Sequence, residues 1–215
     1  MAAKEQMVNA GGPAVATAGA ASRDGRDDRR TEILRLASHI FAERGFVGAT
    51  VRDIAEAAGI LSGSLYHHFD SKESMLEEIL RAMLEGLERQ YEVTAAKDVD
   101  ASTALREMLG IGLRAVVEQR NEIKILHNDY GYFTELERFA FVGEQGHRIM
   151  DLYVQVLDRG VANGEFSSNV DARVAYRAIM GAIFSAVRWF QPDGPMSVED
   201  LADQFADLYI AGLRG

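Results

Sequence analysis

Residues 50–72 read TVRDIAEAAGILSGSLYHHFDSK and predict two short helices joined by a tight turn. The Thr50 hydroxyl can accept the backbone N–H of Asp53, while the Asp53 carboxylate reaches back to the Thr50 amide, a capping box that starts a helix. Behind this cap, apolar residues recur at helical spacing on one face: Val51, Ile54, Ala55 and Ala58. Gly59 tolerates a positive φ, so the helix is predicted to end there after about two turns.

A second helix is predicted directly after this turn. Ser62 can cap it, and the helix is predicted to continue to Phe69 with Leu65 and Phe69 on its buried side. Two short helices about a glycine turn form a helix-turn-helix, whose second helix enters the major groove of DNA. The stretch therefore predicts DNA binding.

Many residues between Arg30 and Leu76 match one family pattern in register: Ile33, Leu34, Ala37, Phe41, Gly45, Phe46, Thr50, Val51, Ile54, Ala55, Ala58, Gly59, Gly63, Ser64, Leu65, Tyr66, His68, Phe69, Ser71, Lys72 and Glu73. This stretch resembles the DNA-binding domain of the TetR family of transcriptional regulators. The resemblance implies an all-α protein with an N-terminal three-helix helix-turn-helix domain and a C-terminal helical bundle for ligand binding and dimerisation. Leu61 departs from the pattern, which usually has a small hydroxyl residue there, so capping is expected to pass to Ser62.

The chain divides into three predicted segments. Residues 1–25 are rich in Ala and Gly without apolar periodicity and are predicted to be a disordered N-terminal extension. Residues 26–74 form the helix-turn-helix domain, with a first helix from about Asp27 to Arg44, and residues 75–215 form the ligand-binding and dimerisation domain. Later helices are predicted over residues 72–94, 102–118, 122–128, 134–163 (weakened near Gly143 and Gly146), 171–190 and from Ser197 onward.

The composition favours a packed helical protein. Hydrophobic residues make up 47% of the chain, and there are three prolines and no cysteines, which excludes disulfides and thiolate sites. The apolar run over residues 178–187 is too short to span a bilayer, and the N-terminus lacks the apolar core of a signal peptide. A cytoplasmic protein without membrane contact is expected.

The net charge of −10 is unevenly distributed along the chain. Between residues 23 and 72, eight basic residues balance eight acidic ones, and Lys4 cancels Glu5, so the whole negative charge follows Lys72. A neutral domain with local basic clusters can still bind phosphates, with the acidic remainder pointing away from DNA.

The candidate DNA-binding residues lie in three places: Arg29 and Arg30 before the helix-turn-helix, a set within it, and Lys72 after it. The two arginines can act as a basic arm on the DNA backbone or minor groove, or can be a solvated helix start. Lys72 follows the cap of the next helix, where its ammonium and the free N–H groups can hold a phosphate. The set within the motif is Thr50, Arg52, Ser62, Gly63, Ser64, Tyr66 and His67, and in the TetR family the tyrosine typically contacts a phosphate.

Other chemistry is poorly supported. His67 and His68 point about 100° apart on a helix and lack a partner one turn away, so no metal site is predicted. No sequence motif of hydrolases, nucleotide-binding enzymes or zinc proteases is present. The cluster of His127, Asp129 and Tyr130 is more typical of capping and packing than of acid–base catalysis. Neither an enzyme nor a cofactor is predicted.

The helix predicted over residues 171–190 carries small residues on one stripe, Ala178, Ala182 and Ser185, beside Gly181. Small residues let another helix approach closely. In the TetR family the last two helices usually form the homodimer interface, and such a dimer presents two recognition helices to a palindromic operator. The alternative is that both stripes are monomer core.

The candidate effector site lies in the C-terminal domain. Arg188, Trp189 and Phe190 with the following prolines resemble a pattern of TetR-type regulators of fatty-acid and acyl-CoA metabolism. The whole chain also resembles a branch of the family that represses cholesterol catabolism in mycobacteria and rhodococci, which implies release by the CoA thioester of a steroid-ring metabolite. Such a ligand needs an apolar tunnel and cations for its phosphates. The predicted contacts are Tyr130, Phe133, Arg177, Phe184, Arg188 and Trp189.

The sequence therefore predicts a homodimeric repressor on double-stranded operator DNA, with an acyl-CoA-type effector and control of steroid or lipid catabolism genes. Two alternatives remain. One is a TetR-type regulator of another apolar effector, such as a fatty acid or a drug. The other is a small-molecule-binding enzyme with a vestigial DNA domain.

Overall fold

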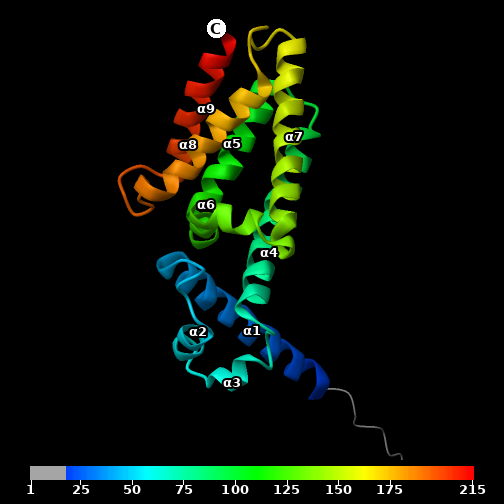
Figure 1. The fold of residues 1–215 in the computed structure, drawn as a ribbon. Helices are drawn as coiled ribbons and strands as arrows, with labels where there is room; N and C mark the ends of the chain where they lie inside the picture. Colours follow the sequence, from blue (N-terminus) through cyan, green and yellow to red (C-terminus); the bar gives the residue numbers. More distant parts are fainter. Residues whose placement is uncertain (1–17) are drawn as a thin grey trace, which may run out of the picture.

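A computed structural model describes residues 18–215, and these are α-helical with short connections and no strand. Figure 1 shows a small group of helices at one end, a larger bundle at the other and one long helix joining them. The elements are α1 (Ala18–Arg44), α2 (Val51–Ala57), α3 (Ser62–Leu65), α4 (Lys72–Ala95), α5 (Ala101–Glu118), α6 (Arg120–Thr134), the 3₁₀ turn η1 (Glu137–Phe139), α7 (Ala140–Ala162), α8 (Ala172–Trp189) and α9 (Val198–Arg214). The all-α prediction is confirmed.

The head, defined here as the described part of the chain up to residue 74, packs α1, α2 and α3 around fully buried Ile33, Phe41, Ile54 and Leu65. Helix α1 begins at Ala18, well before the predicted start at Asp27. The prediction of disorder over residues 1–25 is therefore wrong for residues 18–25, while residues 1–17 lie outside the described residues. Alanine and arginine are strong helix formers, so a helix anchored by its packed part can extend toward the N-terminus without an apolar stripe.

The body, residues 75–215, is a bundle in which α5 packs against α4, α7, α8 and α9. Its buried side chains come from every helix and include Leu76, Leu80 and Leu87 on α4. No helix among residues 18–215 has both the length and the apolar character needed to cross a membrane.

Two boundaries in the body differ from the prediction. Helix α6 covers residues 120–134 rather than 122–128, and the helix predicted from Thr134 is broken by a turn and η1 before α7 begins at Ala140. The weakening expected near Gly143 and Gly146 is absent, because α7 continues through both glycines. Neither glycine has an atom within 4 Å of the place where a Cβ would lie, so both sit on an open side of the helix.

Candidate DNA interface and effector cavity

The first helix of the motif starts as predicted. Thr50 Oγ1 accepts the Asp53 amide at 3.2 Å, and Asp53 Oδ2 accepts the Thr50 amide at 2.9 Å, which completes the capping box. The Thr50 hydroxyl and amide hydrogen bonds lower the pKa of the Asp53 carboxyl, so it stays ionised as an acceptor. Gly59 has a φ of +65° and ends the turn after α2, as predicted.

The second helix is shorter than predicted. Helix α3 ends at Leu65, and the chain continues in a turn in which the amides of His68 and Phe69 donate to the Leu65 carbonyl. Leu65 and Phe69 are buried, as predicted. The prediction that Ser62 caps this helix is wrong. The N-cap position falls on Leu61, which makes no side-chain hydrogen bond there, and Ser62 is already the first helical residue.

The helix-turn-helix exposes most of the predicted DNA-binding set. Thr50, Arg52, Gly63, Tyr66 and His67 are exposed, while Ser62 and Ser64 are half-buried. No atom lies within 4 Å of the position that a Cβ on Gly63 would take, so the surface around it is open. Figure 1 places α3 at the far end of the molecule from the acidic body. This arrangement allows a DNA groove to reach α3 without meeting the negative charge of the body.

Arg29 and Arg30 are engaged within the chain rather than extended as an arm. Arg29 pairs with Glu32 and donates to the carbonyl of Ala58 at the end of α2. Arg30 pairs with Glu78 on α4, and its guanidinium lies 4.4 Å from the centre of the Phe69 ring. Because both guanidinium groups already have partners in the chain, the arrangement does not favour the predicted basic arm. It favours a structural role, in which the two arginines hold α1 against α2 and α4.

Lys72 also has partners in its own chain. Its Nζ donates to the carbonyls of Phe46 at 2.9 Å and Ala49 at 3.0 Å, with Val47 at 3.4 Å, and it lies 4.6 Å from the Phe46 ring centre. An ammonium group has three donors, and these three carbonyls use them. The geometry therefore favours a structural role, in which Lys72 stabilises the connection between α1 and α2. It does not favour the predicted phosphate contact.

Aromatic rings join the head to the body. The Phe46 ring lies 6.4 Å from Phe133 and 6.3 Å from Phe139, and those two rings are 5.2 Å apart. Phe133 is fully buried in this junction and does not line the apolar cavity among α4 to α8 that is described below. This position does not favour the predicted effector contact for Phe133. Sequence spacing could not show this, because the partner ring comes from the turn between α1 and α2.

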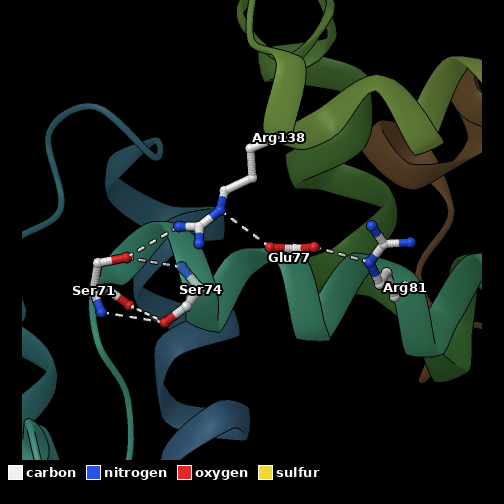
Figure 2. Close-up of polar contacts among 5 residues, drawn as sticks. All are labelled: Ser71, Ser74, Glu77, Arg81 and Arg138. Atoms are coloured by element: carbon white, nitrogen blue, oxygen red, sulfur yellow. Dashed lines mark hydrogen bonds and ion pairs between the residues drawn. The ribbon is translucent and has the colours of Figure 1, made fainter.

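Polar contacts strengthen the same junction on α4. Figure 2 shows Arg138 of η1 reaching across to Ser71 Oγ at 3.3 Å and to Glu77 Oε2 at 3.1 Å. Ser71 is the cap of α4, and Glu77 also pairs with Arg81. Arg138 of the body therefore fixes the position of the first turns of α4, the helix that connects the head to the body.

An apolar cavity of about 510 Å³ lies inside the body among α4, α5, α6, α7 and α8. Its apolar walls are formed by Leu84, Leu87, Ala115, Ile123, Leu126, Val142, Ile149, Met150, Met180, Ile183 and Phe184, with Gly112, Gly143 and Gly146. Six polar side chains complete the lining, Tyr91, His127, Tyr130, His147, Tyr176 and Arg177. The volume and the mostly apolar walls are those of a site for an organic ligand.

Three of the predicted effector residues line this cavity: Tyr130, Arg177 and Phe184. Arg188 and Trp189 are absent from the lining. Arg188 instead donates to His127 Nε2 at 2.6 Å, and Trp189 is 51% exposed. The His127 ring stacks on Phe184, with centroids 6.1 Å apart, and both residues line the cavity. Arg188 is therefore linked to the cavity wall by its hydrogen bond to His127.

The sequence does not indicate four of the polar lining residues as effector contacts: Tyr91, His127, His147 and Tyr176. Of these, His127 belongs to a cluster that is more typical of capping and packing. Burial raises the pKa of Tyr91 and of Tyr176 to about 12, so both phenols stay neutral hydrogen-bonding groups. Tyr91 follows Leu84 and Leu87 on the inner face of α4, which is the one sequence signal that could have placed it in the cavity.

One face of α8 and α9 remains uncovered in the monomer. Ala178, Gly181 and Ser185 are exposed, and Val174 and Leu208 are 62% and 71% exposed. The alternative that the small-residue stripe is monomer core is wrong for these positions, since the α8 core is built from the opposite side by residues such as Ile183. Apolar side chains beside an open small-residue stripe can pack against another helix.

Two family models match the chain. Residues 33–79 match "Bacterial regulatory proteins, tetR family", and residues 98–213 match "Tetracyclin repressor-like, C-terminal domain". The second match alone covers more than half of the chain. Both matches fall on the units described above, the first on the head with the start of α4 and the second on α5 to α9.

Curated relatives agree with these matches. The HTH-type transcriptional repressor KstR2 of Rhodococcus jostii is 40% identical over 189 residues, which cover 88% of this chain and 93% of the relative. KstR2 of Mycobacterium tuberculosis is 33% identical over 187 residues, covering 87% and 94%.

Solved structures show the same fold. The structure of "ketosteroid transcriptional regulator KstR2 of Mycobacterium tuberculosis" superposes with a TM-score of 0.82 at 34% identity and covers 86% of this chain and 94% of that chain. AibR, in a complex with isovaleryl coenzyme A and operator DNA, shares the fold with a TM-score of 0.73 at 24% identity, covering 86% and 97%.

Proposed function

The chain belongs to the TetR family of transcriptional regulators, and we propose that it is a homodimeric repressor that a CoA thioester releases from a palindromic operator. Membership makes it a TetR-type transcriptional repressor related to KstR2, and the matched families and relatives are regulators rather than enzymes. The proposal adds the effector, the operator symmetry and the genes under control.

The observation that carries the proposal is the apolar cavity with Arg177 on its wall. A polycyclic acyl group buries apolar surface, and about 510 Å³ is within the range of small-molecule sites. Arg177 is exposed on α8 as well as lining the cavity, so its guanidinium can meet a phosphate outside while the acyl group lies inside. His127 and His147 add hydrogen-bonding groups to the same lining.

The relatives support the ligand class. The structural neighbour from M. tuberculosis is described as a ketosteroid transcriptional regulator, and its 34% identity extends over nearly its whole chain. We therefore propose a CoA thioester of a steroid-ring metabolite as the effector, and genes of cholesterol, steroid or lipid catabolism as the targets. AibR illustrates that this fold can hold a CoA thioester and operator DNA together.

The exposed face of α8 and α9 supports the homodimer. A twofold dimer through this face carries two copies of α3, and a palindromic operator with half-sites about one helical turn apart fits such a pair. The head is joined to the cavity-bearing body through the Phe46 junction and Arg138, so occupancy of the cavity can change the separation of the two heads.

A regulator of a fatty acid or a drug is the second candidate, and the arginines of α8 bear on the choice. Arg177 lines the cavity and Arg188 contacts a lining histidine, whereas Arg173 is exposed at the start of the helix. An uncharged effector would need neither cation. A fatty acid carboxylate or the phosphates of a CoA thioester can each pair with Arg177, so the arrangement favours an anionic effector over an uncharged drug.

Fluorescence anisotropy of the protein on labelled DNA from its own upstream region tests the proposal. A panel of steroid-derived CoA thioesters, a fatty acyl-CoA, free CoA and the free acids is titrated into the complex. We expect release by a steroid-derived thioester but not by free CoA or a free acid. Release by an uncharged drug or a free fatty acid would favour the second candidate, and absence of DNA binding at low salt would overturn the regulator on this DNA.

A further inference from the structure

Leu61 occupies a position where a polar side chain would stabilise the recognition helix. Six α-helices in the described part of the chain follow a residue in extended conformation, and five of those residues cap their helix with a side-chain oxygen: Thr50, Ser71, Asp100, Asp171 and Ser197. Leu61 is the sixth, with φ −73° and ψ 143°, and it leaves the cap unmade. Its backbone geometry is suitable for a cap, so the missing oxygen is a property of the residue and not of the turn.

The Leu61 side chain also finds no place in the core of the head. It is 80% exposed, the highest value among the large hydrophobic side chains of the described residues. Its neighbour Ile60 packs against the core, and Leu65 one turn later is fully buried. A single exposed leucine is ordinary on a protein surface. This one, however, takes the place of a capping group directly before the helix that would enter DNA, two residues ahead of Gly63, whose Cβ position is open.

The major groove offers one apolar feature to such a side chain. Base edges present hydrogen-bond donors and acceptors there, and the C5-methyl group of thymine is the exception. A leucine at the start of a recognition helix gains from contact with that methyl group, whereas over any other base edge it would cover polar groups without bonding them. We propose that Leu61 reads the 5-methyl group of one thymine in each operator half-site.

This proposal rests on the proposed DNA-binding function and adds a residue that selects sequence. Burying one methyl group contributes about a fourfold change in affinity, so loss of the contact in both half-sites should cost about fifteenfold. Replacement by serine should restore the cap, raising the stability of the free protein while removing the preference for the methyl group.

Deoxyuridine substitution tests the contact directly, since it removes the methyl group and keeps base pairing. Each thymine of the bound site is replaced in turn, and affinity is measured by anisotropy for wild type, Leu61→Ala and Leu61→Ser. We expect one thymine in each half-site where the replacement weakens wild-type binding about fourfold and leaves both variants unchanged. Val93→Ala removes an exposed side chain on α4 in the body and should behave as wild type.

The outcomes separate this proposal from the function on which it rests. Equal methyl dependence in wild type and the Leu61 variants, or no methyl dependence at any thymine, would overturn the role of Leu61 while leaving the operator-binding protein intact. Thermal unfolding of the same variants checks that they are folded, so that a loss of affinity can be separated from damage to the head. A wild-type protein that binds no DNA overturns both.

Discussion

Lys72 connects the start of α4 to the turn that precedes the recognition surface. Its ammonium satisfies backbone carbonyls of residues 46, 47 and 49, which end the connection from α1 and lead into the cap of α2. A hydrogen bond to a charged group contributes roughly 1.5–3 kcal/mol to stability. The residue therefore bears on DNA binding by fixing the position of α2.

Replacing Lys72 by Met keeps the stem and removes the charge. We expect the free energy of unfolding to fall by roughly 2 kcal/mol, because the carbonyls lose their donors. The slope of log affinity against log salt should change little. Arg52→Gln is the matched comparison, since Arg52 is exposed on α2. Its loss from both protomers should lower the slope by about two while leaving stability nearly unchanged. Should Lys72→Met lower the slope and keep stability, the sequence prediction of a phosphate contact would be right.

A substitution of Arg177 tests whether this side chain binds the phosphates of the proposed CoA thioester. Removing a charge-assisted hydrogen bond weakens binding by about tenfold or more, so Arg177→Gln should shift the midpoint of release by a CoA thioester to at least tenfold higher concentration. Operator affinity without effector should be unchanged. Arg173→Gln, four residues earlier on α8 and outside the cavity lining, should leave the midpoint unchanged. Equal shifts in the two variants would point to a general charge effect instead.

At the scale of elements, the helix starts could be predicted and several partners could not. The capping box at Thr50 forms as predicted, and the predicted helix start at Ser197 carries another, because donor and acceptor lie three residues apart and need no tertiary structure. Arg30 and Glu78 are 48 positions apart, and only the packing of α1 on α4 brings them together. The sequence therefore showed which residues were basic but not which of them were already paired.

The cavity shows the same limit. Its apolar walls follow from helical periodicity, and three predicted contacts line it. Phe133 and Tyr130 lie on the same short helix, yet one faces the head and the other the cavity. The division depends on how α6 packs against its neighbours, and the break between α6 and α7 lies at residues 135–139 rather than at the predicted 129–133.

Helices α4 and α7 are joined by an ion pair that should make stability depend on pH. The Arg148 guanidinium, followed by the Gln145 amide, lowers the pKa of the Glu88 carboxyl against the opposing effect of burial. A lowered folded pKa contributes stability that is complete above the unfolded pKa of about 4.3 and is lost as pH falls through the folded value.

Glu88→Gln should therefore lose less stability than wild type when pH is lowered from about 5 toward 3, although it should be less stable than wild type at pH 7. Chemical unfolding at several pH values measures both effects. Glu85→Gln is the control, because Glu85 is exposed and its partner Arg89 is 3.9 Å away. If Glu88→Gln and wild type lose stability in parallel, the pair does not contribute to acid sensitivity.

At the scale of the whole molecule, the exposed face of α8 and α9 should set the oligomeric state. Placing charges there by Val174→Glu with Leu208→Glu should give a monomer at micromolar concentration, because two like-charged patches would be buried against each other. Operator affinity should fall on the order of a hundredfold as the second half-site is lost. Val93→Glu adds a charge on α4, away from this face, and should remain dimeric. Sedimentation and anisotropy measure the two effects, and an unchanged dimer would place the interface elsewhere.

The junction around Phe46 has a consequence for engineering. Chimaeric regulators are made by grafting the reading head of one protein onto the sensing body of another, and a cut between residues 74 and 75 looks natural from the chain alone. Phe46 is buried against rings of the body, and Lys124 of α6 pairs with Glu43 of α1. A graft that ignores these contacts would pair the α1–α2 turn of one protein with α6 and η1 residues of another that need not match it. Working hybrids should carry the matching α6 and η1 residues along with the new head.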